Sequence, residues 1–250
     1  MPHILVTNDD GVTAPGLRVL AHSLAEIGKV TIIAPSQERS AAAQSLTLRH
    51  PIFCEQIAEG EWSVEGTPAD AMILAFHSLL PARPDLVVSG INRGSNLGEN
   101  VYYSGTIGAA MEGAINNVPS IAISLATKAK DVSFAPAANF ARRLAALVLK
   151  EGLPHGVLLN VNVPVAWKGG VRFTRQSPKI TRNVLQKGQD PRGRVYYWLS
   201  EQRLTEDIGA DTDHAAILAG EISVTPLVID HTHAPSLNHL SSWKDRLEQK

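Results

Sequence analysis

Short runs of apolar residues alternate with helical patterns along the first two-thirds of this chain. The runs are nearly continuous and rich in Val and Ile, as expected of strands buried on both faces of a sheet. They cover residues 4–6, 30–34, 86–88, 121–123 and 157–161. Apolar residues at helical spacing follow the first run at Leu17, Leu20, Ala21, Leu24 and Ile27, and recur at Phe140, Leu144, Leu147 and Val148. The repeated order strand, helix, strand predicts an α/β protein with a doubly wound, mostly parallel sheet, whose first helix is capped by Gly28.

The pattern changes after about residue 170. Hairpin-like pieces at 171–173 and 195–198 are separated by polar stretches, and the polar, basic span 176–194 is too long for an ordinary connection in a compact domain. We expect this span to project from the body and to pack on another subunit. The chain is therefore interpreted as one domain, 1–250, in which approximately 170–250 form a C-terminal β-rich extension used in oligomerisation.

Composition narrows the class of protein. The chain has 250 residues, 44% of them hydrophobic, which is enough to bury one substantial core. Its net charge of −1 provides no overall field that would attract nucleic acid or membranes. The single cysteine, Cys54, excludes an internal disulfide framework, and we interpret it as a buried, small apolar residue. No secretion leader or run of membrane-spanning length is evident, so we expect a cytoplasmic protein.

Two adjacent carboxylates, Asp9 and Asp10, follow the first apolar run directly. Ligands bind at the carboxyl ends of strands in open α/β sheets, and paired carboxylates there repel each other unless a cation lies between them. Their oxygens are the hard ligands that Mg²⁺ or Mn²⁺ prefers. The alternative is that these residues only form a turn or cap the next helix.

A second group of polar and small residues follows the run at 86–88. Glycines and asparagines at 90–98 are followed by Ser104, Gly105 and Thr106, directly before a helical pattern at Ile107, Ala110, Met111, Ala114 and Ile115. Backbone N–H groups and hydroxyls at the start of a helix can hold a phosphate. The alternative is a glycine loop with an ordinary helix cap. Because neither GxxxxGK[ST] nor GxGxxG occurs, a P-loop NTPase and a dinucleotide dehydrogenase are disfavoured.

A set of motifs in order along nearly the whole chain resembles the SurE family of stationary-phase survival proteins, which are metal-dependent nucleoside monophosphate phosphatases. The motifs are TNDDG at 7–11, ERS before SLTL, GTPAD, VVSGINRGSNLG, YSGT followed by AAMEGA, LNVNVP, DPRG, TDHAA and ISVTPL. Each motif alone is weakly specific, whereas the ordered set is highly specific.

The resemblance implies a Rossmann-like fold and a set of site residues. One Mg²⁺ or Mn²⁺ per subunit would be bound by Asp9, Asp10, Ser40 and Asn92, and the catalytic residues would be Asp9, Asp10 and Asn92. Asn96 and the segment Ser104, Gly105 and Thr106 would hold the phosphate. The implied reaction is hydrolysis of a nucleoside monophosphate, and of short polyphosphate as a further substrate, by a homodimer or homotetramer that exchanges C-terminal elements between subunits. The resemblance leaves open whether an aspartate also acts as nucleophile or base.

Three positions depart from the family pattern. Ala41 and Ala43 stand where a glycine and a serine are usual, and Asn100 stands where an acidic residue is typical. If position 41 has a positive φ, Ala41 strains the loop; otherwise the change is benign.

Other readings are weaker. A haloacid-dehalogenase-type phosphatase needs Asp-x-Asp, a serine hydrolase needs G-x-S-x-G, and a nucleotide-sensing module would bind nucleotide without turnover. His231, His233 and His239 have a spacing that could bind a transition metal, but we interpret them as solvated residues of a polar tail.

Overall fold

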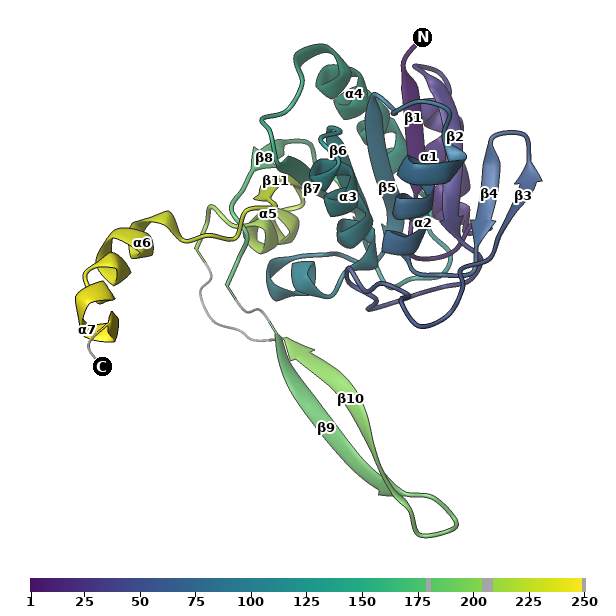
Figure 1. The fold of residues 1–250 in the computed structure, drawn as a ribbon. Helices are drawn as coiled ribbons and strands as arrows, with labels where there is room; N and C mark the ends of the chain where they lie inside the picture. The colour runs from purple at the N-terminus through teal and green to yellow at the C-terminus, as the bar shows by residue number, and fades with distance from the viewer. Residues whose placement is uncertain (179–180, 204–208, 249–250) are drawn as a thin grey trace.

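The protein is built around one large, mixed sheet, as Figure 1 shows. The computed structural model describes residues 1–178, 181–203 and 209–248. Within them, nine strands form the sheet in the order β3-β4-β2-β1-β5-β6-β7-β11-β8. Their bounds are β1 His3–Thr7, β2 Lys29–Pro35, β3 Cys54–Ala58, β4 Glu61–Val64, β5 Leu86–Arg93, β6 Ser120–Ala126, β7 Val157–Pro164, β8 Val171–Phe173 and β11 Ile222–Val228.

The central strands are parallel. Strands β4, β2, β1, β5, β6 and β7 run in one direction, whereas β3 pairs antiparallel with β4 and β11 pairs antiparallel with β7. The chain moves outward from β1 first through β2 and later through β5. The order therefore reverses between β1 and β5, which is where such sheets place their ligands. The prediction of a doubly wound, mostly parallel sheet is confirmed.

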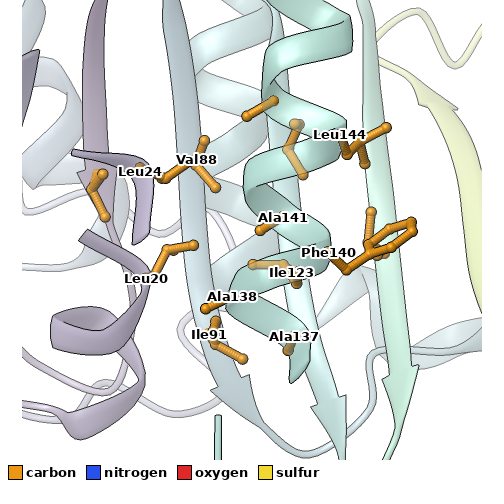
Figure 2. Close-up of a cluster of buried hydrophobic side chains, with 14 of the residues drawn as sticks. Leu20, Leu24, Val88, Ile91, Ile123, Ala137, Ala138, Phe140, Ala141 and Leu144 are labelled. Atoms are coloured by element: carbon orange, nitrogen blue, oxygen red, sulfur yellow. The ribbon is translucent and has the colours of Figure 1, made fainter. Parts of the chain in front are cut away.

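Helices cover both faces of this sheet. On one face lie α1 (Pro15–Leu24) and α4 (Ala135–Glu151), and Figure 2 shows Leu20 and Leu24 facing Ala141 and other residues of α4. On the other face lie α2 (Pro68–Leu74), which continues into a π-helical turn over Ala75–Leu79, and α3 (Gly105–Ile115). Successive side chains of β1 point to opposite faces of the sheet and so contribute to the core on each side. Ile4 and Val6 pack in one hydrophobic cluster and Leu5 packs in the other.

Two local expectations in this part are wrong. Helix α1 ends at Leu24, with Ala25 as its C-terminal cap, so that Ile27 and Gly28 lie beyond the helix. Cys54 is exposed rather than buried. Cys54 begins β3, which is an edge strand of the sheet and exposes all five of its residues, so the exposure of Cys54 follows from its place in the sheet.

The C-terminal part contains a hairpin separate from the main sheet. Strands β9 (Thr181–Gln189) and β10 (Val195–Arg203) pair only with each other among the described strands and extend away from the body (Figure 1). The predicted strand at 195–198 is thus found, but its partner lies within the span 176–194, whereas 171–173 joins the main sheet as β8 beside β11. A polar strand such as β9 carries no apolar alternation that could have revealed it.

Among the described residues, three helices follow the hairpin. Helix α5 (Asp213–Ala219) packs on β11 and β7, whereas α6 (Ala234–Ser241) and α7 (Lys244–Glu248) form a tail that runs away from the body (Figure 1). No residue of α6 is buried. Among the residues that the structure describes, no helix has the length and apolar character needed to cross a membrane.

Candidate active site

Asp9 and Asp10 lie at the carboxyl end of β1, next to the point where the strand order reverses. Asp9 is buried and Asp10 is partly buried. The turn after the strand is made by Asn8, whose side chain donates to Gly11 O at 2.9 Å and accepts from Gly11 N at 3.2 Å. Because Asn8 supplies the turn, the alternative reading of the two aspartates as turn residues is not needed.

The surroundings disfavour a negative charge on both aspartates. Burial raises the pKa of Asp9, and Glu38 adds to this, although a hydrogen bond from Thr106 acts in the opposite direction. Burial and the charge of Asp9 raise the pKa of Asp10 to about 6, although the backbone N–H of Arg93 stabilises the Asp10 carboxylate. A pair of carboxylates in this setting fits a bound divalent cation, which would compensate both charges.

The N-terminus of α3 lies directly against Asp9. Thr106 Oγ1 donates to Asp9 Oδ1 at 2.5 Å. Gly105 permits this approach, since a Cβ atom there would lie 2.7 Å from Asp9 Cβ. Ser104 caps the helix, because its hydroxyl oxygen accepts from Ile107 N at 3.2 Å. This is the helix-capping role that the alternative interpretation predicted for the segment.

The loop after β2 reaches the same place. Arg39 N donates to Asp9 O at 2.7 Å, which brings Ser40 to the site. Ser40 is exposed, and its hydroxyl donates to Glu38 Oε1 at 2.5 Å. Ala41 has a φ of 58° and Ala43 a φ of 51°. Because both values are positive, the backbone of this loop is strained at these two alanines.

Asn92 and Asn96 come from the segment that follows the middle of β5. Asn92 Nδ2 donates to Gly94 O at 2.8 Å, and within the described part of the chain Asn92 Oδ1 has no hydrogen-bond partner. Asn96 is buried, and its Nδ2 donates to Ser124 Oγ at 2.9 Å. The side-chain nitrogen of Asn96 thus has a protein partner, which ties this residue to β6.

Two asparagines of β7, which the sequence reasoning did not assign to the site, clamp the backbone of Asn96. Asn162 Oδ1 accepts from Asn96 N at 2.8 Å, and Asn162 Nδ2 donates to Asn96 O at 3.1 Å. Asn160 Nδ2 donates to the same oxygen at 2.8 Å. The alternation in LNVNVP could have predicted this role. Two asparagines at i and i+2 of a buried strand lie on the same face of the sheet, where both side chains need hydrogen-bond partners.

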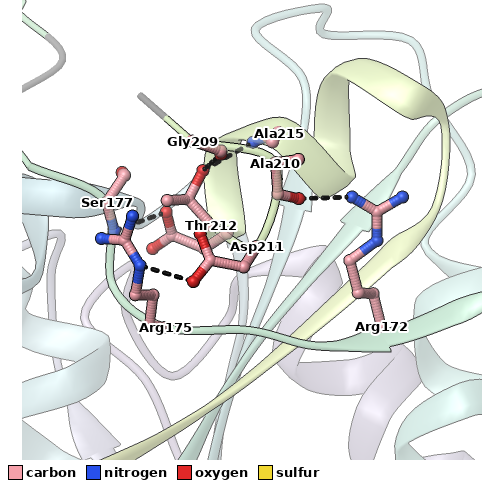
Figure 3. Close-up of polar contacts among 9 residues, drawn as sticks. Arg172, Arg175, Ser177, Gly209, Ala210, Asp211, Thr212 and Ala215 are labelled. Carbon is pink, nitrogen blue, oxygen red and sulfur yellow. Dashed lines mark hydrogen bonds and ion pairs between the residues drawn. The ribbon is translucent and has the colours of Figure 1, made fainter. Parts of the chain in front are cut away.

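A buried carboxylate, Asp213, holds the next part of that segment. It accepts from Gly98 N at 3.1 Å, from Ser177 N at 3.1 Å and from His214 N at 2.7 Å. Figure 3 shows the turn that leads into α5, where Thr212 caps the helix and Arg175 pairs with Asp211 at 2.7 Å. Asp213 was not predicted as a site residue, because its motif, TDHAA, indicates only the resemblance to the family and no role for the carboxylate.

The tail histidines show no sign of a metal site. His231, His233 and His239 are exposed, and His233 Nδ1 lies 2.6 Å from Ser236 Oγ. Among the described residues, no group of three or more His, Cys, Asp and Glu could hold a metal ion. The site at the end of β1 offers the two carboxylates of Asp9 and Asp10, which is fewer than the three side chains of such a group.

Fold and site together define a doubly wound α/β protein with paired carboxylates and a helix N-terminus at the carboxyl edge of its sheet. Residues 4–183 match the family model described as "Survival protein SurE". The chain belongs to the SurE family.

Similar proteins agree over nearly the full length. A protein of Geotalea daltonii named "5'-nucleotidase SurE" is 46% identical over 245 residues, covering 96% of this chain and 98% of that protein. One of Geobacter metallireducens with the same name is 45% identical over 243 residues, covering 96% of each. The crystal structure of the SurE protein from Aquifex aeolicus has a TM-score of 0.87 and 36% identity, covering 97% of this chain and 100% of that one.

Proposed function

We propose that this chain is a metal-dependent 5'-nucleotidase that hydrolyses nucleoside monophosphates to a nucleoside and inorganic phosphate. The observation that carries the proposal is the contact between Asp9 and the N-terminus of α3, through Thr106 Oγ1 at 2.5 Å and the missing side chain of Gly105. This contact places a carboxylate suited to binding a cation beside a helix N-terminus suited to binding an anion. The names of the relatives, which match over nearly the full length, support the same activity.

One divalent ion per subunit, Mg²⁺ or Mn²⁺, would be held by Asp9, Asp10, Ser40 and Asn92. The two carboxylates supply charge, and Asn92 supplies an amide oxygen that has no hydrogen-bond partner among the described residues. The exposed Ser40 would have to turn its hydroxyl from Glu38 to join them. When bound, such an ion would polarise a phosphoryl oxygen and offset its charge.

The phosphate would lie against the N-terminus of α3. Ser104, Gly105 and Thr106 begin this 11-residue helix, whose N–H groups and dipole favour an anion. Asn96 would complete the phosphate site from a backbone fixed by β7. These groups are preorganised, so they can stabilise charge that develops on the phosphoryl oxygens without rearrangement. The terminal phosphate of a short polyphosphate presents the same group, and we include it as a second substrate.

We further propose that the whole chain is one domain and that approximately 170–250 form an assembly extension. The hairpin β9–β10 and the tail α6–α7 would pack on neighbouring subunits, with the tail exchanged between them, in a homodimer or homotetramer. Both elements lie away from the body of their own chain (Figure 1). The proposed substrates are cytoplasmic metabolites, and we place the reaction in the cytoplasm.

Release of inorganic phosphate tests the activity. We expect release from a panel of nucleoside monophosphates, loss of it in EDTA, and recovery when Mg²⁺ or Mn²⁺ is restored. Asp9→Asn and Asp10→Asn should abolish turnover with the fold intact, and Asn92→Ala should weaken it less, since a neutral ligand contributes less than a carboxylate. Asp85→Asn is the matched control, because Asp85 is an exposed carboxylate just before β5, at the opposite edge of the sheet.

Two outcomes would contradict the proposal. Turnover that is unaffected by EDTA and by both aspartate variants would remove the metal from the mechanism. Nucleotide binding without turnover, in the presence of either metal, would favour a nucleotide-sensing module instead.

A further inference from the structure

Ser40, one of the proposed metal ligands, lies in a loop that has little buried surface of its own. The Ser40 loop, residues 39–47, follows β2, and its residues 39–41 and 44–46 are exposed. Segments with few buried contacts open easily. The Ser40 hydroxyl can therefore be kept at the end of β1 only if hydrogen bonds hold the backbone on both sides of it.

The start of the Ser40 loop is attached to two elements. Arg39 N donates to Asp9 O at 2.7 Å, at the end of β1. The side chain of the same residue reaches in another direction, because Arg39 Nε donates to Gly66 O at 3.2 Å. Gly66 is buried and lies two residues before α2. The loop thus begins between the carboxylates and the start of α2.

The end of the Ser40 loop is held by Asp70, in the first turn of α2. Asp70 is 2% exposed, and its Oδ1 accepts from Thr47 N at 2.9 Å, whereas its Oδ2 accepts from Thr67 N at 2.8 Å. Thr67 caps α2, and its hydroxyl donates to Ser45 O at 2.6 Å. These anchors belong to the motif GTPAD, residues 66–70, to which the proposed function gives no role.

Hydrogen bonds favour the ionised form of Asp70 despite its burial. Burial acts to raise the pKa of Asp70, but hydrogen bonds from Thr47 and Thr67 outweigh it and hold the pKa below its ordinary value. The carboxylate joins two segments, because each of its oxygens accepts from a different backbone N–H group. Removal of Asp70 would therefore release the loop as well as uncap the helix.

The middle of the Ser40 loop is strained and depends on such anchors. Ala41 and Ala43 have φ values of 58° and 51°, which residues other than glycine keep only where the surrounding structure holds them. Helix α3 lies against the same stretch, since a Cβ atom at Gly108 would be 2.4 Å from Ala43 O. Once Thr47 is released, relaxation of this strain would change the position of Ser40.

We infer that Asp70 is a positioning residue for the proposed metal site, because it fixes the Ser40 loop to α2 and so presents the Ser40 hydroxyl beside Asp9 and Asp10. The inference rests on the proposed function and deepens it, since it gives the motif GTPAD a part in metal binding. Asp70 acts through the backbone of the loop and needs no contact with the ion or with the substrate.

Metal affinity in paired variants tests this role. We expect Asp70→Ala to weaken Mn²⁺ binding about tenfold in calorimetry, as loss of a residue that orients a ligand usually does. Ser40→Ala should weaken it at least as much. In the Ser40→Ala background, however, Asp70→Ala should leave the Mn²⁺ affinity unchanged, because the ligand that Asp70 positions is already absent. Its effect on the Tm should persist in that background, which separates positioning from stability.

Asp85→Ala is the matched control. The carboxylate of Asp85 also accepts from the backbone of a distant segment, His3 N at 2.7 Å, but lies at the opposite edge of the sheet. This variant should bind Mn²⁺ as the wild-type protein does.

Thr67→Val provides the same comparison if Asp70→Ala does not fold. It removes the hydrogen bond to Ser45 O and keeps the carboxylate of Asp70. We expect a several-fold loss of Mn²⁺ affinity, which should again be absent in the Ser40→Ala background.

Two results would overturn the inference. One is an equal loss of Mn²⁺ affinity from Asp70→Ala with and without the Ser40 hydroxyl. The other is unchanged Mn²⁺ affinity in Ser40→Ala, or in the folded variant of Asp70 or Thr67. In both cases the proposed function stands if the wild-type protein releases phosphate from nucleoside monophosphates with Mn²⁺. Failure of the wild-type protein to bind Mn²⁺ or to release phosphate would instead contradict the proposed function.

Discussion

The surroundings of Asp10 make the metal-free, folded protein less stable when this side chain is ionised. Its pKa is raised from 3.8 to about 6 by burial and by the charge of Asp9, so the folded protein binds this proton more tightly than the unfolded chain does. The stability that this protonation contributes is fully present below about pH 4 and is lost as the pH rises through about 6. A bound cation would compensate the charge that remains above that pH.

Thermal unfolding should therefore respond to metal more strongly at pH 7.5 than at pH 5. We expect saturating Mn²⁺ to raise the Tm at pH 7.5, by about 2–4 °C for each kcal/mol of binding linkage, and to raise it much less at pH 5. Asp10→Asn should reduce the metal-induced shift, whereas Asp85→Asn should leave it unchanged. Equal shifts at both pH values in the wild-type protein would refute this account of Asp10.

Ala41 stores backbone strain in the loop that carries Ser40. At a φ of 58° a side chain costs about 1–2 kcal/mol that glycine does not pay. Ala41→Gly should therefore raise the free energy of unfolding by up to about 1 kcal/mol in urea denaturation. Ala42→Gly, in the same loop but without a positive φ, should lower it slightly. If the two variants have the same stability, the strain at position 41 has no energetic effect.

Thr106 connects the proposed phosphate site to the carboxylate of Asp9. From the sequence we expect Thr106→Val to weaken phosphate-dependent steps and to leave metal binding unchanged. The hydrogen bond from Thr106 Oγ1 to Asp9 Oδ1 changes the second part of that prediction. A hydrogen bond to a charged group is worth about 1.5–3 kcal/mol, so Thr106→Val should lower kcat/KM by about 10- to 100-fold and also weaken Mn²⁺ binding in calorimetry. Unchanged Mn²⁺ affinity would restore the sequence-based expectation.

At the scale of elements, burial decides what the sequence reveals. The central strands were predictable because strands covered on both faces need continuous apolar runs, and the residues at 4–6 and 86–88 have them. Strand β9 was not predictable, because most of its residues are exposed. It pairs with β10 and packs on no hydrophobic core that would require an apolar pattern. For the candidate site, position in the chain located Asp9, Asp10 and the start of α3. The clamp on Asn96 depends on which strand lies beside β6, which only the fold determines.

The asparagines of β7 test how that clamp contributes to the site. Asn162→Ala removes two hydrogen bonds to the Asn96 backbone, and Asn160→Ala removes one. We expect kcat/KM to fall more in Asn162→Ala than in Asn160→Ala, with stability losses of about 1–3 kcal/mol from buried groups left without partners. Inhibition by inorganic phosphate should weaken in the same order. A loss of stability in both variants without any change in kcat/KM would make the pair purely structural.

Across the whole molecule, the exposed apolar residues concentrate on two elements that leave the body. In the hairpin, Trp198 is 68% exposed and Tyr197 is 58% exposed, so these rings do not pack on the sheet of their own chain. In the tail, Leu237, Leu240 and Trp243 are exposed along α6 and just after it. Aromatic residues are favoured anchors of interfaces, and a stable interface buries about 800 Å² on each partner. These elements therefore predict an assembly held by the C-terminal third.

Light scattering at micromolar concentration should show a dimer or a tetramer rather than a 26.9 kDa monomer. Trp198→Glu in the hairpin and Leu240→Glu in the tail should each lower the oligomeric mass, because each places a charge in an apolar contact. Leu147→Glu is the matched control, since Leu147 is an exposed leucine on α4, away from both elements. If the Trp198 variant halves the mass of a tetramer and the Leu240 variant yields monomers, the hairpin joins dimers and the tail makes them. A wild-type monomer with full phosphatase activity would rule out the predicted assembly.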